Sequence, residues 1–363
     1  MDASRARAVL ARTPAIDARL LRELLEAAGG EPARALGARV TQRVALPAAA
    51  QQFLAAPDDA AIDADLAWLA ASAARIVLAT DPHYPPLLLQ GPDAPAALYV
   101  QGSVAALSAP QLAMVGSRSP TPAGGATARE FAAWFARAGL TVTSGLAVGI
   151  DAASHEGALA GGGATVAVYA TGLDRVYPAE HTALAQRIRA QGALVSEFPP
   201  RTPPLRRHFP RRNRIIATLS LGTLVVEAAR YSGSLITARL AVESGREVFA
   251  IPGSIHSPLS RGCHQLIKNG AKLVEEARDV LAELQFSVPK EQLTAPAARP
   301  RQAPELDKEY EMLLDALGFE PATIDVLVAR THLPGESVAS MLLILELEGR
   351  VAALPGGRYG RTP

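Results

Sequence analysis

The 363-residue sequence has little of several features that would identify a function directly. Its single cysteine, Cys263, excludes an internal disulfide framework and a metal site built from several cysteines. No apolar run is long enough to span a bilayer, and the first residues, which include Arg5, Arg7 and Arg12, do not form a secretory signal. These absences predict a cytoplasmic protein that does not bind a membrane.

The sequence also lacks an excess of either charge. It has 36 lysines and arginines against 35 aspartates and glutamates, which gives a formal net charge of +1. Binding to nucleic acid would therefore have to depend on a local basic surface, since attraction follows the local field. The seven histidines show no spacing typical of metal ligands. We expect neither a metal nor a cofactor.

Apolar, β-branched runs alternate with helical patterns through the middle of the chain. Strands are predicted at residues 112–115, 140–143, 165–170, 193–198, 223–226, 248–251 and 272–274. Strands that are apolar on both sides and separated by helices predict a parallel sheet covered on both faces. The expected fold class is α/β, with an extended Rossmann-like parallel sheet.

Changes in composition divide the chain into four parts. Residues 1–75 carry apolar positions at helical spacing and predict a helical domain of the SAM or helix-hairpin-helix kind. Residues 76–285 are the Rossmann-like domain, and the proline-rich residues 286–304 are a linker. Residues 305–363 contain two helical patterns followed by an expected hairpin, which is typical of a winged-helix domain.

Small residues follow several predicted strands, at the edge where parallel sheets bind their ligands. The turns consist of Gly116, Ser117 and Arg118 after the first of these strands, Ser144, Gly145 and Gly149 after the second, and Ser232, Gly233 and Ser234 before a later helix. Glycine lets the backbone approach a phosphate, and the start of a helix offers free N–H groups. The spacing is not GxGxxG, so a dinucleotide is not implied. We expect several anion-binding turns along one edge of the sheet.

Some residues of these turns are also of catalytic types. Ser144, Asp151 and His155 could form a triad, but Asp151 and His155 are one helical turn apart and can equally fix the loop. Glu227, at a strand end, could be a catalytic acid or a structural acceptor. We favour anion binding over catalysis and expect that the protein is not an enzyme.

The densest positive charge lies between residues 200 and 220. Fourteen residues without an acid contain six arginines, at positions Arg201, Arg206, Arg207, Arg211, Arg212 and Arg214. His208 and Phe209 lie inside this run. Arginines follow a phosphate backbone while rings stack on bases, a combination used on single-stranded nucleic acid. A solvated surface is the alternative, and we favour the nucleic acid.

In order and spacing, these motifs resemble the DNA-processing protein A family, also called Smf. The resemblance covers about residues 81–280 and rests on VGSR, TSGLAVGIDAASH, GLDRVYP, HFPRRNRIIATLS, EAARYSGSLITA, REVFAIPGS and RGCHQLIKNGAKLV. His181 departs from it, because many members have asparagine there. The resemblance implies a homodimer that binds single-stranded DNA, protects incoming DNA in natural transformation and helps to load the RecA recombinase. It implies no catalytic activity.

The resemblance assigns Arg118, Ser144, Gly145 and either Arg211 or Arg212 to a phosphate-binding pocket, with Phe209 as a base contact. Combined with the turns and the basic run, the expected DNA-binding residues are Gly116, Ser117, Arg118, Ser144, Gly145, Gly149, His208, Phe209, Arg211, Arg212, Asn213, Arg214, Ser232, Gly233 and Ser234.

Two other functions stay open at this point. A nucleotide phosphoribohydrolase of the lysine-decarboxylase-like Rossmann group would share the fold, but such enzymes carry a PGGxGT-type turn where this chain has SGSLIT. A regulator of duplex DNA would use the predicted helix at residues 337–347, which contains no arginine and has Glu346 and Glu348 at its end. That helix suits a protein contact better than a phosphate backbone.

Overall fold

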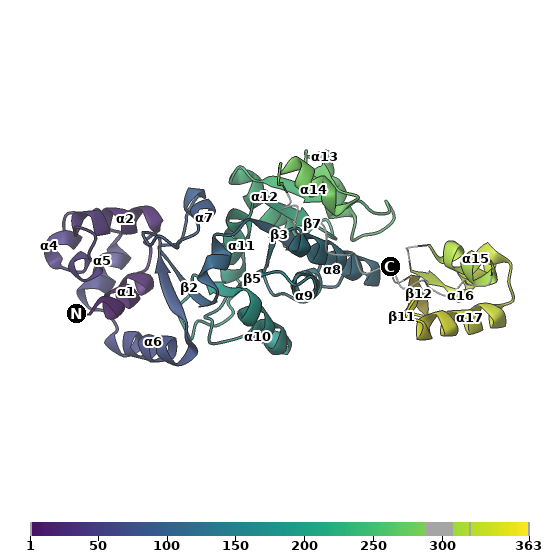
Figure 1. Cartoon of the computed structure of the whole chain (residues 1–363), viewed down its shortest axis with the longest axis horizontal. Coiled ribbons are helices and arrows are strands. Elements are labelled where there is room, and N and C mark those ends of the chain that lie inside the picture. Colours follow the sequence, from purple (N-terminus) through teal and green to yellow (C-terminus); the bar gives the residue numbers. More distant parts are fainter. Residues whose placement is uncertain (1, 288–307, 319–320, 362–363) are drawn as a thin grey trace.

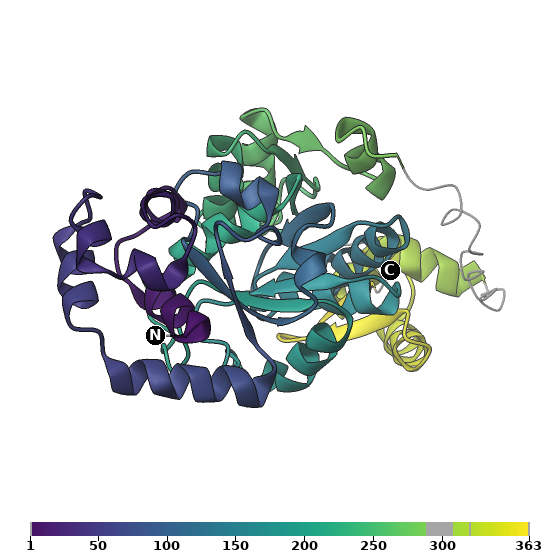
Figure 2. The same ribbon diagram turned by 60° about the vertical axis from the view of Figure 1, so that its left-hand side comes forward.

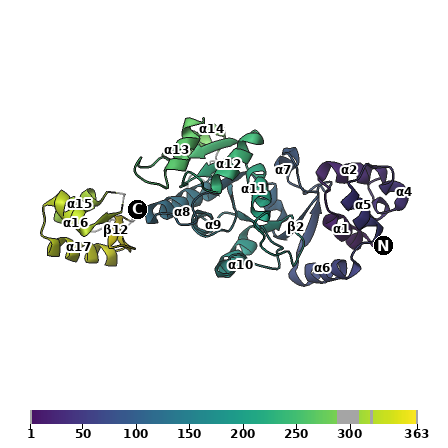
Figure 3. The same cartoon turned by 180° about the vertical axis from the view of Figure 1, so that it is seen from behind.

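The computed structural model describes residues 2–287, 308–318 and 321–361. Helices from the N-terminal region lie at one end, a large sheet lies in the middle, and a small C-terminal domain lies at the other end (Figure 1). The view from behind shows the same order (Figure 3). The predicted linker at residues 286–304 falls almost wholly outside the described residues, and the domain boundaries stay predictions.

The N-terminal region is helical, as the sequence predicts. Its helices are α1 (Ala3–Arg12), α2 (Ala18–Ala27), α3 (Pro32–Ala35), α4 (Ala38–Thr41), α5 (Ala48–Ala55) and α6 (Asp59–Ser72). Asp2, Asp17 and Asp58 cap α1, α2 and α6 by accepting a hydrogen bond from a backbone N–H of the first turn. Figure 2 brings these helices forward and shows α6 running below the others.

The central sheet has nine strands in the order β1-β2-β6-β5-β4-β3-β7-β8-β9. Their bounds are β1 Arg75–Leu78, β2 Ala97–Gly102, β3 Gln111–Val115, β4 Thr141–Ser144, β5 Thr165–Val168, β6 Ala193–Ser196, β7 Gly222–Val225, β8 Glu247–Ala250 and β9 Lys272–Leu273. The seven predicted strands are β3 to β9, and they pair in parallel. The sequence prediction missed β1 and β2, which extend one edge as antiparallel strands.

Helices cover both faces of this sheet, because its strands are apolar on both sides. Leu112 and Met114 of β3 pack against one layer of helices, while Ala113 and Val115 pack against the other. The first layer contains α8 (Pro122–Arg137), α9 (Ile150–Ala160), α10 (Thr182–Gln191) and α14 (Ala277–Glu283). The second contains α7 (Pro86–Gln90), α11 (His208–Leu219), α12 (Ser234–Glu243) and α13 (Arg261–Lys268). The α/β fold class is therefore confirmed.

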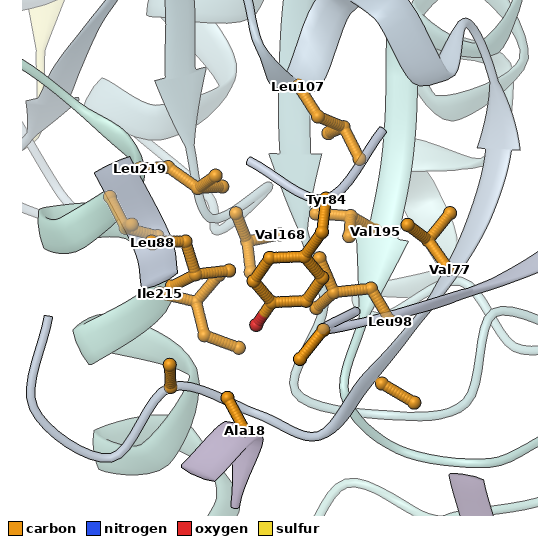
Figure 4. Close-up of a cluster of buried hydrophobic side chains, with 14 of the residues drawn as sticks. Ala18, Val77, Tyr84, Leu88, Leu98, Leu107, Val168, Val195, Ile215 and Leu219 are labelled. Carbon is orange, nitrogen blue, oxygen red and sulfur yellow. The ribbon is translucent and has the colours of Figure 1, made fainter. Parts of the chain in front are cut away.

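The N-terminal helices share a hydrophobic core with the sheet. Figure 4 shows Tyr84 at the centre of this core, with Ala18 of α2 on one side and Leu98 of β2 on another. The Tyr84 hydroxyl donates to the carbonyl of Pro95 at 2.6 Å, so its one polar atom is satisfied. Burial of the ring raises the pKa of Tyr84 above its ordinary value. The first helices are thus fixed to the domain that follows them.

The C-terminal domain has the winged-helix arrangement that the sequence predicts. Its elements are α15 (Lys308–Leu317), β10 (Ala322–Thr323), α16 (Ile324–Thr331), α17 (Gly335–Leu347), β11 (Val351–Leu354) and β12 (Arg358–Arg361). The three strands form a separate sheet in the order β10-β12-β11. Leu313, Leu327 and Leu342 meet in its core. Across the described ranges, no helix has both the length and the apolar character that crossing a bilayer requires.

Candidate nucleic-acid interface

A cavity of about 860 Å³ opens at the carboxyl ends of β3 and β7. These two strands are neighbours, but the chain leaves β3 toward β4 on one side and reaches β7 only after crossing the sheet. Such a topological switch point is where open α/β sheets bind ligands. The lining is Val115, Gly116, Ser117, Arg118, Ala147, Asp151, Phe209, Pro210, Arg212, Asn213, Ile216, Ala229, Arg230, Tyr231, Ser232, Gly233, Ser234, Ile236, Thr237, Pro258 and Arg261.

The turn after β3 is held in place by its neighbours on both sides. The Ser117 N–H donates to the Glu227 carbonyl at 2.7 Å, and the Ser117 carbonyl accepts from the Ile150 N–H at 3.1 Å. Gly149 lies against this turn with φ +84°, where a Cβ would stand 2.8 Å from the Arg118 carbonyl. Glycine is therefore required at position 149 for the turn to approach α9 so closely.

Arg212 forms the floor of the cavity. Its side chain is buried, and its Nη1 donates to the carbonyls of Gly145 and Val168, the latter at 2.8 Å. Burial lowers the pKa of Arg212 to about 10; nearby Asp151 opposes this shift and Arg118 adds to it. The guanidinium is therefore still charged at neutral pH, and it places a fixed positive charge beneath the cavity.

Asp151 lines the same cavity and partly balances the positive charge of Arg212. Its carboxylate accepts from the N–H groups of Gly145 at 3.1 Å and Ala147 at 3.3 Å. Burial raises the pKa of Asp151, while Arg212 acts in the opposite direction. It is the only acid in the lining, against four arginines. The balance of charge in the cavity favours an anionic ligand.

One wall of the cavity carries an aromatic ring with an arginine over it. The guanidinium carbon of Arg118 lies 5.6 Å from the centre of the Phe209 ring, within the range of a cation–π contact. Phe209 also meets Tyr177 edge to face, with 5.9 Å between the ring centres. Phe209 lies in the first turn of α11 and is half-buried. It can offer a face to a flat ligand.

Another part of the lining is the loop between β7 and α12. Arg230 and Tyr231 are both exposed there, and the guanidinium carbon of Arg230 lies 5.9 Å from the centre of the Tyr231 ring. Ser232, Gly233 and Ser234 follow at the start of α12. Several N–H groups here already have acceptors, since those of Ser232, Leu235 and Ile236 donate to the carbonyls of Ala229, Ser232 and Gly233. The positive end of the helix dipole still favours an anion at this start.

The cavity brings together nine of the fifteen predicted residues: Gly116, Ser117, Arg118, Phe209, Arg212, Asn213, Ser232, Gly233 and Ser234. Six lie outside its lining: Ser144, Gly145, Gly149, His208, Arg211 and Arg214. Gly145 supports the floor, because a Cβ there would overlap the Arg212 guanidinium. His208 is buried and stacks on Phe198 with 4.2 Å between the ring centres. Gly145 therefore affects the cavity through Arg212, and His208 packs in the interior instead of lining the cavity.

The arginines of residues 201–214 are less free than their sequence suggests. Arg211 and Arg214 both pair with Glu197, whose side chain is only 4% exposed. Arg201 pairs with Asp65 of α6, which is fully buried and also binds Arg12. Two carboxylates outside the run, Glu197 and Asp65, therefore hold three of its six arginines in ion pairs. Arg206 and Arg207 stay exposed, and much of the cavity's charge comes from Arg118, Arg230 and Arg261 instead.

The residues of catalytic type are not arranged as a triad. The Ser144 hydroxyl donates to the Met114 carbonyl at 2.6 Å, and Nδ1 of His155 lies 2.7 Å from the Thr165 hydroxyl. Both carboxylate oxygens of Glu227 accept from Thr121, one from its N–H and one from its hydroxyl. Glu227 is thus a structural acceptor at the start of α8. The described residues contain no group of three or more His, Cys, Asp or Glu side chains placed to hold a metal ion.

The sequence prediction missed three residues of the lining that carry an argument for ligand binding: Arg230, Tyr231 and Arg261. A signal for the first two is present in the sequence, because RYSGS places an arginine and a tyrosine directly before a small-residue turn. Arg261 starts α13 and is the first residue of the RGCHQLIKNGAKLV motif. Nothing in that motif indicates that Arg261 reaches the cavity.

Two family models match the chain. The model of DNA recombination-mediator protein A matches residues 75–285, and the model of the DprA winged helix domain matches residues 296–357. The first match spans the sheet and the whole cavity. The second includes the C-terminal elements from α15 to β11.

Similar proteins include one curated protein and two solved structures. Protein Smf of Escherichia coli is 45% identical over 315 residues, which are 85% of this chain and 83% of that protein. DNA processing protein A of Streptococcus pneumoniae superposes with a TM-score of 0.68 at 37% identity, covering 79% of this chain and 100% of that one. DNA processing protein A of Helicobacter pylori, studied for its single-stranded DNA binding mode, superposes with a TM-score of 0.53 at 27% identity. The match covers 58% of this chain and 95% of that one.

Proposed function

The chain belongs to the family of DNA recombination-mediator protein A, and we propose that it binds single-stranded DNA in the cavity at the ends of β3 and β7. The observation that carries the proposal is the combination in one cavity of four arginines, two small-residue turns and an aromatic ring. The name of the Helicobacter pylori relative supports the choice of ligand.

The phosphates are bound by the backbone and the arginines. The turn at residues 116–118 and the start of α12 follow adjacent strands, so both can face one stretch of DNA backbone. The Ser117 N–H is already bound to the Glu227 carbonyl, so the arginines and the helix dipole supply most of the attraction. Arg118, Arg230 and Arg261 are exposed around this seat, and no ion pair neutralises them among the described residues. Their guanidinium groups can form paired hydrogen bonds to phosphate oxygens.

The aromatic ring favours a single strand over a duplex. Phe209 presents its ring inside the wall of the cavity, where only an unstacked base can reach it. In a duplex the faces of the bases are covered by their neighbours, whereas in a single strand each base can stack on a protein ring. α17 of the winged helix offers no comparable surface, because it ends in Leu347 between Glu346 and Glu348.

We extend the proposal to the partners and the cellular role of the family. The chain would act in DNA processing, protect DNA that enters the cell during natural transformation, and deliver it to the RecA recombinase. It would act as a homodimer and without catalysis. Family membership supports these roles, and the exposed edge strand β9, with Leu273 on it, offers an apolar surface for a second copy.

Fluorescence anisotropy with a labelled 15-nucleotide thymidine strand tests the DNA site. Replacing Arg118 by alanine should weaken binding about 10-fold and reduce the slope of log K against log salt by about 0.7, because one phosphate contact is lost. Arg211→Ala should have a smaller effect, since Glu197 already neutralises Arg211.

Arg239→Ala is the matched control, because Arg239 is an exposed arginine of α12 that lies outside the cavity and pairs with Glu243. Its affinity should equal that of the unaltered protein. Equal affinity for a duplex of the same length, or an Arg118→Ala variant that binds normally, would contradict the proposal.

A further inference from the structure

Tyr231 is an exposed aromatic side chain at the rim of the DNA cavity. Its side chain is 90% exposed, although tyrosine rings in folded proteins are usually partly covered. It packs only lightly on its neighbour, since the guanidinium carbon of Arg230 lies 5.9 Å from its ring centre. No core contact explains a ring at this position, which makes a ligand contact the simplest explanation.

The pair of Arg230 and Tyr231 repeats the pair formed by Arg118 and Phe209. Arg118 lies over Phe209 at 5.6 Å, so the lining of the cavity contains two rings with one arginine beside each. The two pairs come from different elements, α11 with the turn after β3 on one side and the β7–α12 loop on the other. Both anion-binding turns lie at the ends of β3 and β7, which are hydrogen-bonded neighbours.

We infer that Tyr231 is a second stacking surface for DNA bases, and that the cavity takes a phosphate flanked by two bases. The inference rests on the proposed binding of single-stranded DNA in this cavity. Both rings belong to the same lining as the two turns, so one base next to a bound phosphate can stack on Phe209 and the other on Tyr231. Arg230 keeps the Tyr231 ring in place through the cation–π contact and adds charge for the next phosphate.

Three variants separate the ring from the hydroxyl and from simple hydrophobic area. Tyr231→Ala should weaken binding of a 15-nucleotide thymidine strand by about 5-fold or more, which is the effect of losing one stacked base. Tyr231→Phe should bind like the unaltered protein, because the aromatic face is kept. Tyr231→Leu should behave like Tyr231→Ala. Folding should be unaffected in all three, since the side chain is exposed and donates no hydrogen bond within the described residues.

A strand of the same length and charge that lacks its bases provides the decisive comparison. Tyr231→Ala and the unaltered protein should bind this abasic strand equally, because no base remains to stack. If Tyr231→Ala binds the thymidine strand normally while Arg118→Ala does not, the inference about Tyr231 is wrong and the DNA site stands. If the unaltered protein binds neither strand, the proposed function itself fails. A loss in Tyr231→Phe as large as that in Tyr231→Ala would assign the effect to the hydroxyl and refute stacking.

Discussion

Replacing Gly145 by alanine should destabilise the protein through Arg212, although position 145 does not line the cavity. A Cβ at position 145 would overlap the Arg212 guanidinium, with Nη2 at only 2.6 Å. Arg212 would have to leave the carbonyls of Gly145 and Val168, which it binds in a buried position. Each charge-assisted hydrogen bond contributes about 1.5–3 kcal/mol, so the expected loss is about 3–6 kcal/mol in the free energy of unfolding.

Equilibrium unfolding in urea, followed by tryptophan fluorescence, measures this loss. Trp134 belongs to α8, which packs on the sheet, so its emission reports on the domain that contains the cavity. The free energy follows from linear extrapolation to zero denaturant. The same variant should also bind DNA more weakly, because the charge beneath the cavity is displaced.

Gly125→Ala is the matched control, since it makes the same chemical change inside a helix where the nearest atom, Nη1 of Arg129, lies at an ordinary 3.7 Å. It should leave stability unchanged or raise it by up to about 1 kcal/mol. In an Arg212→Met background, Gly145→Ala should cost about 1 kcal/mol or less. The reasoning would be refuted if Gly145→Ala lowered the free energy of unfolding just as much in the Arg212→Met protein. It would also be refuted if Gly145→Ala alone lowered that free energy by less than about 1 kcal/mol.

Two further predictions concern buried polar groups. Asp65→Asn should lower the free energy of unfolding, measured by urea unfolding, by about 3–5 kcal/mol, because it leaves Arg12 and Arg201 without their carboxylate partner. The control is Asp63→Asn, which alters a 64% exposed partner of Arg5 and should lower the free energy of unfolding by about 1 kcal/mol at most. Burial lowers the pKa of His155 to about 3, whereas the unfolded chain has the ordinary histidine value of 6.5. The unfolded state therefore takes up a proton as the pH falls below 6.5 while the folded state does not, so the free energy of unfolding falls between pH 6.5 and about pH 3. Between pH 7 and pH 5 the unaltered protein should lose about 2 kcal/mol more than His155→Gln, measured by urea unfolding at each pH, and parallel pH profiles would contradict this.

The sequence was sufficient to predict the sheet and the place of the site. Each parallel strand from β3 to β8 is marked by a short apolar run, because burial on both faces leaves few polar positions in it. The turns at residues 116–118 and 232–234 were predicted to converge, since carboxyl ends of parallel strands share one edge. β1 and β2 were missed because antiparallel edge strands carry no crossover helix to mark them.

Long-range contacts were beyond sequence reasoning. Arg201 and Asp65 are 136 residues apart, and no local pattern indicates that a buried carboxylate on α6 removes this charge from the basic run. Glu197 does the same for Arg211 and Arg214. Charge density in the sequence therefore indicated an anionic ligand, which the arginines of the cavity also favour, but it drew on arginines that have structural partners.

A crystal structure of the full chain with a short thymidine oligonucleotide tests the central claim most directly. Our account predicts a phosphate between the turns at residues 116–118 and 232–234, with one base on Phe209, the next on Tyr231, and Arg118 bonded to the backbone of the strand. An oligonucleotide bound instead on α17 of the winged helix, or along Arg206 and Arg207 with the cavity unfilled, would contradict the account.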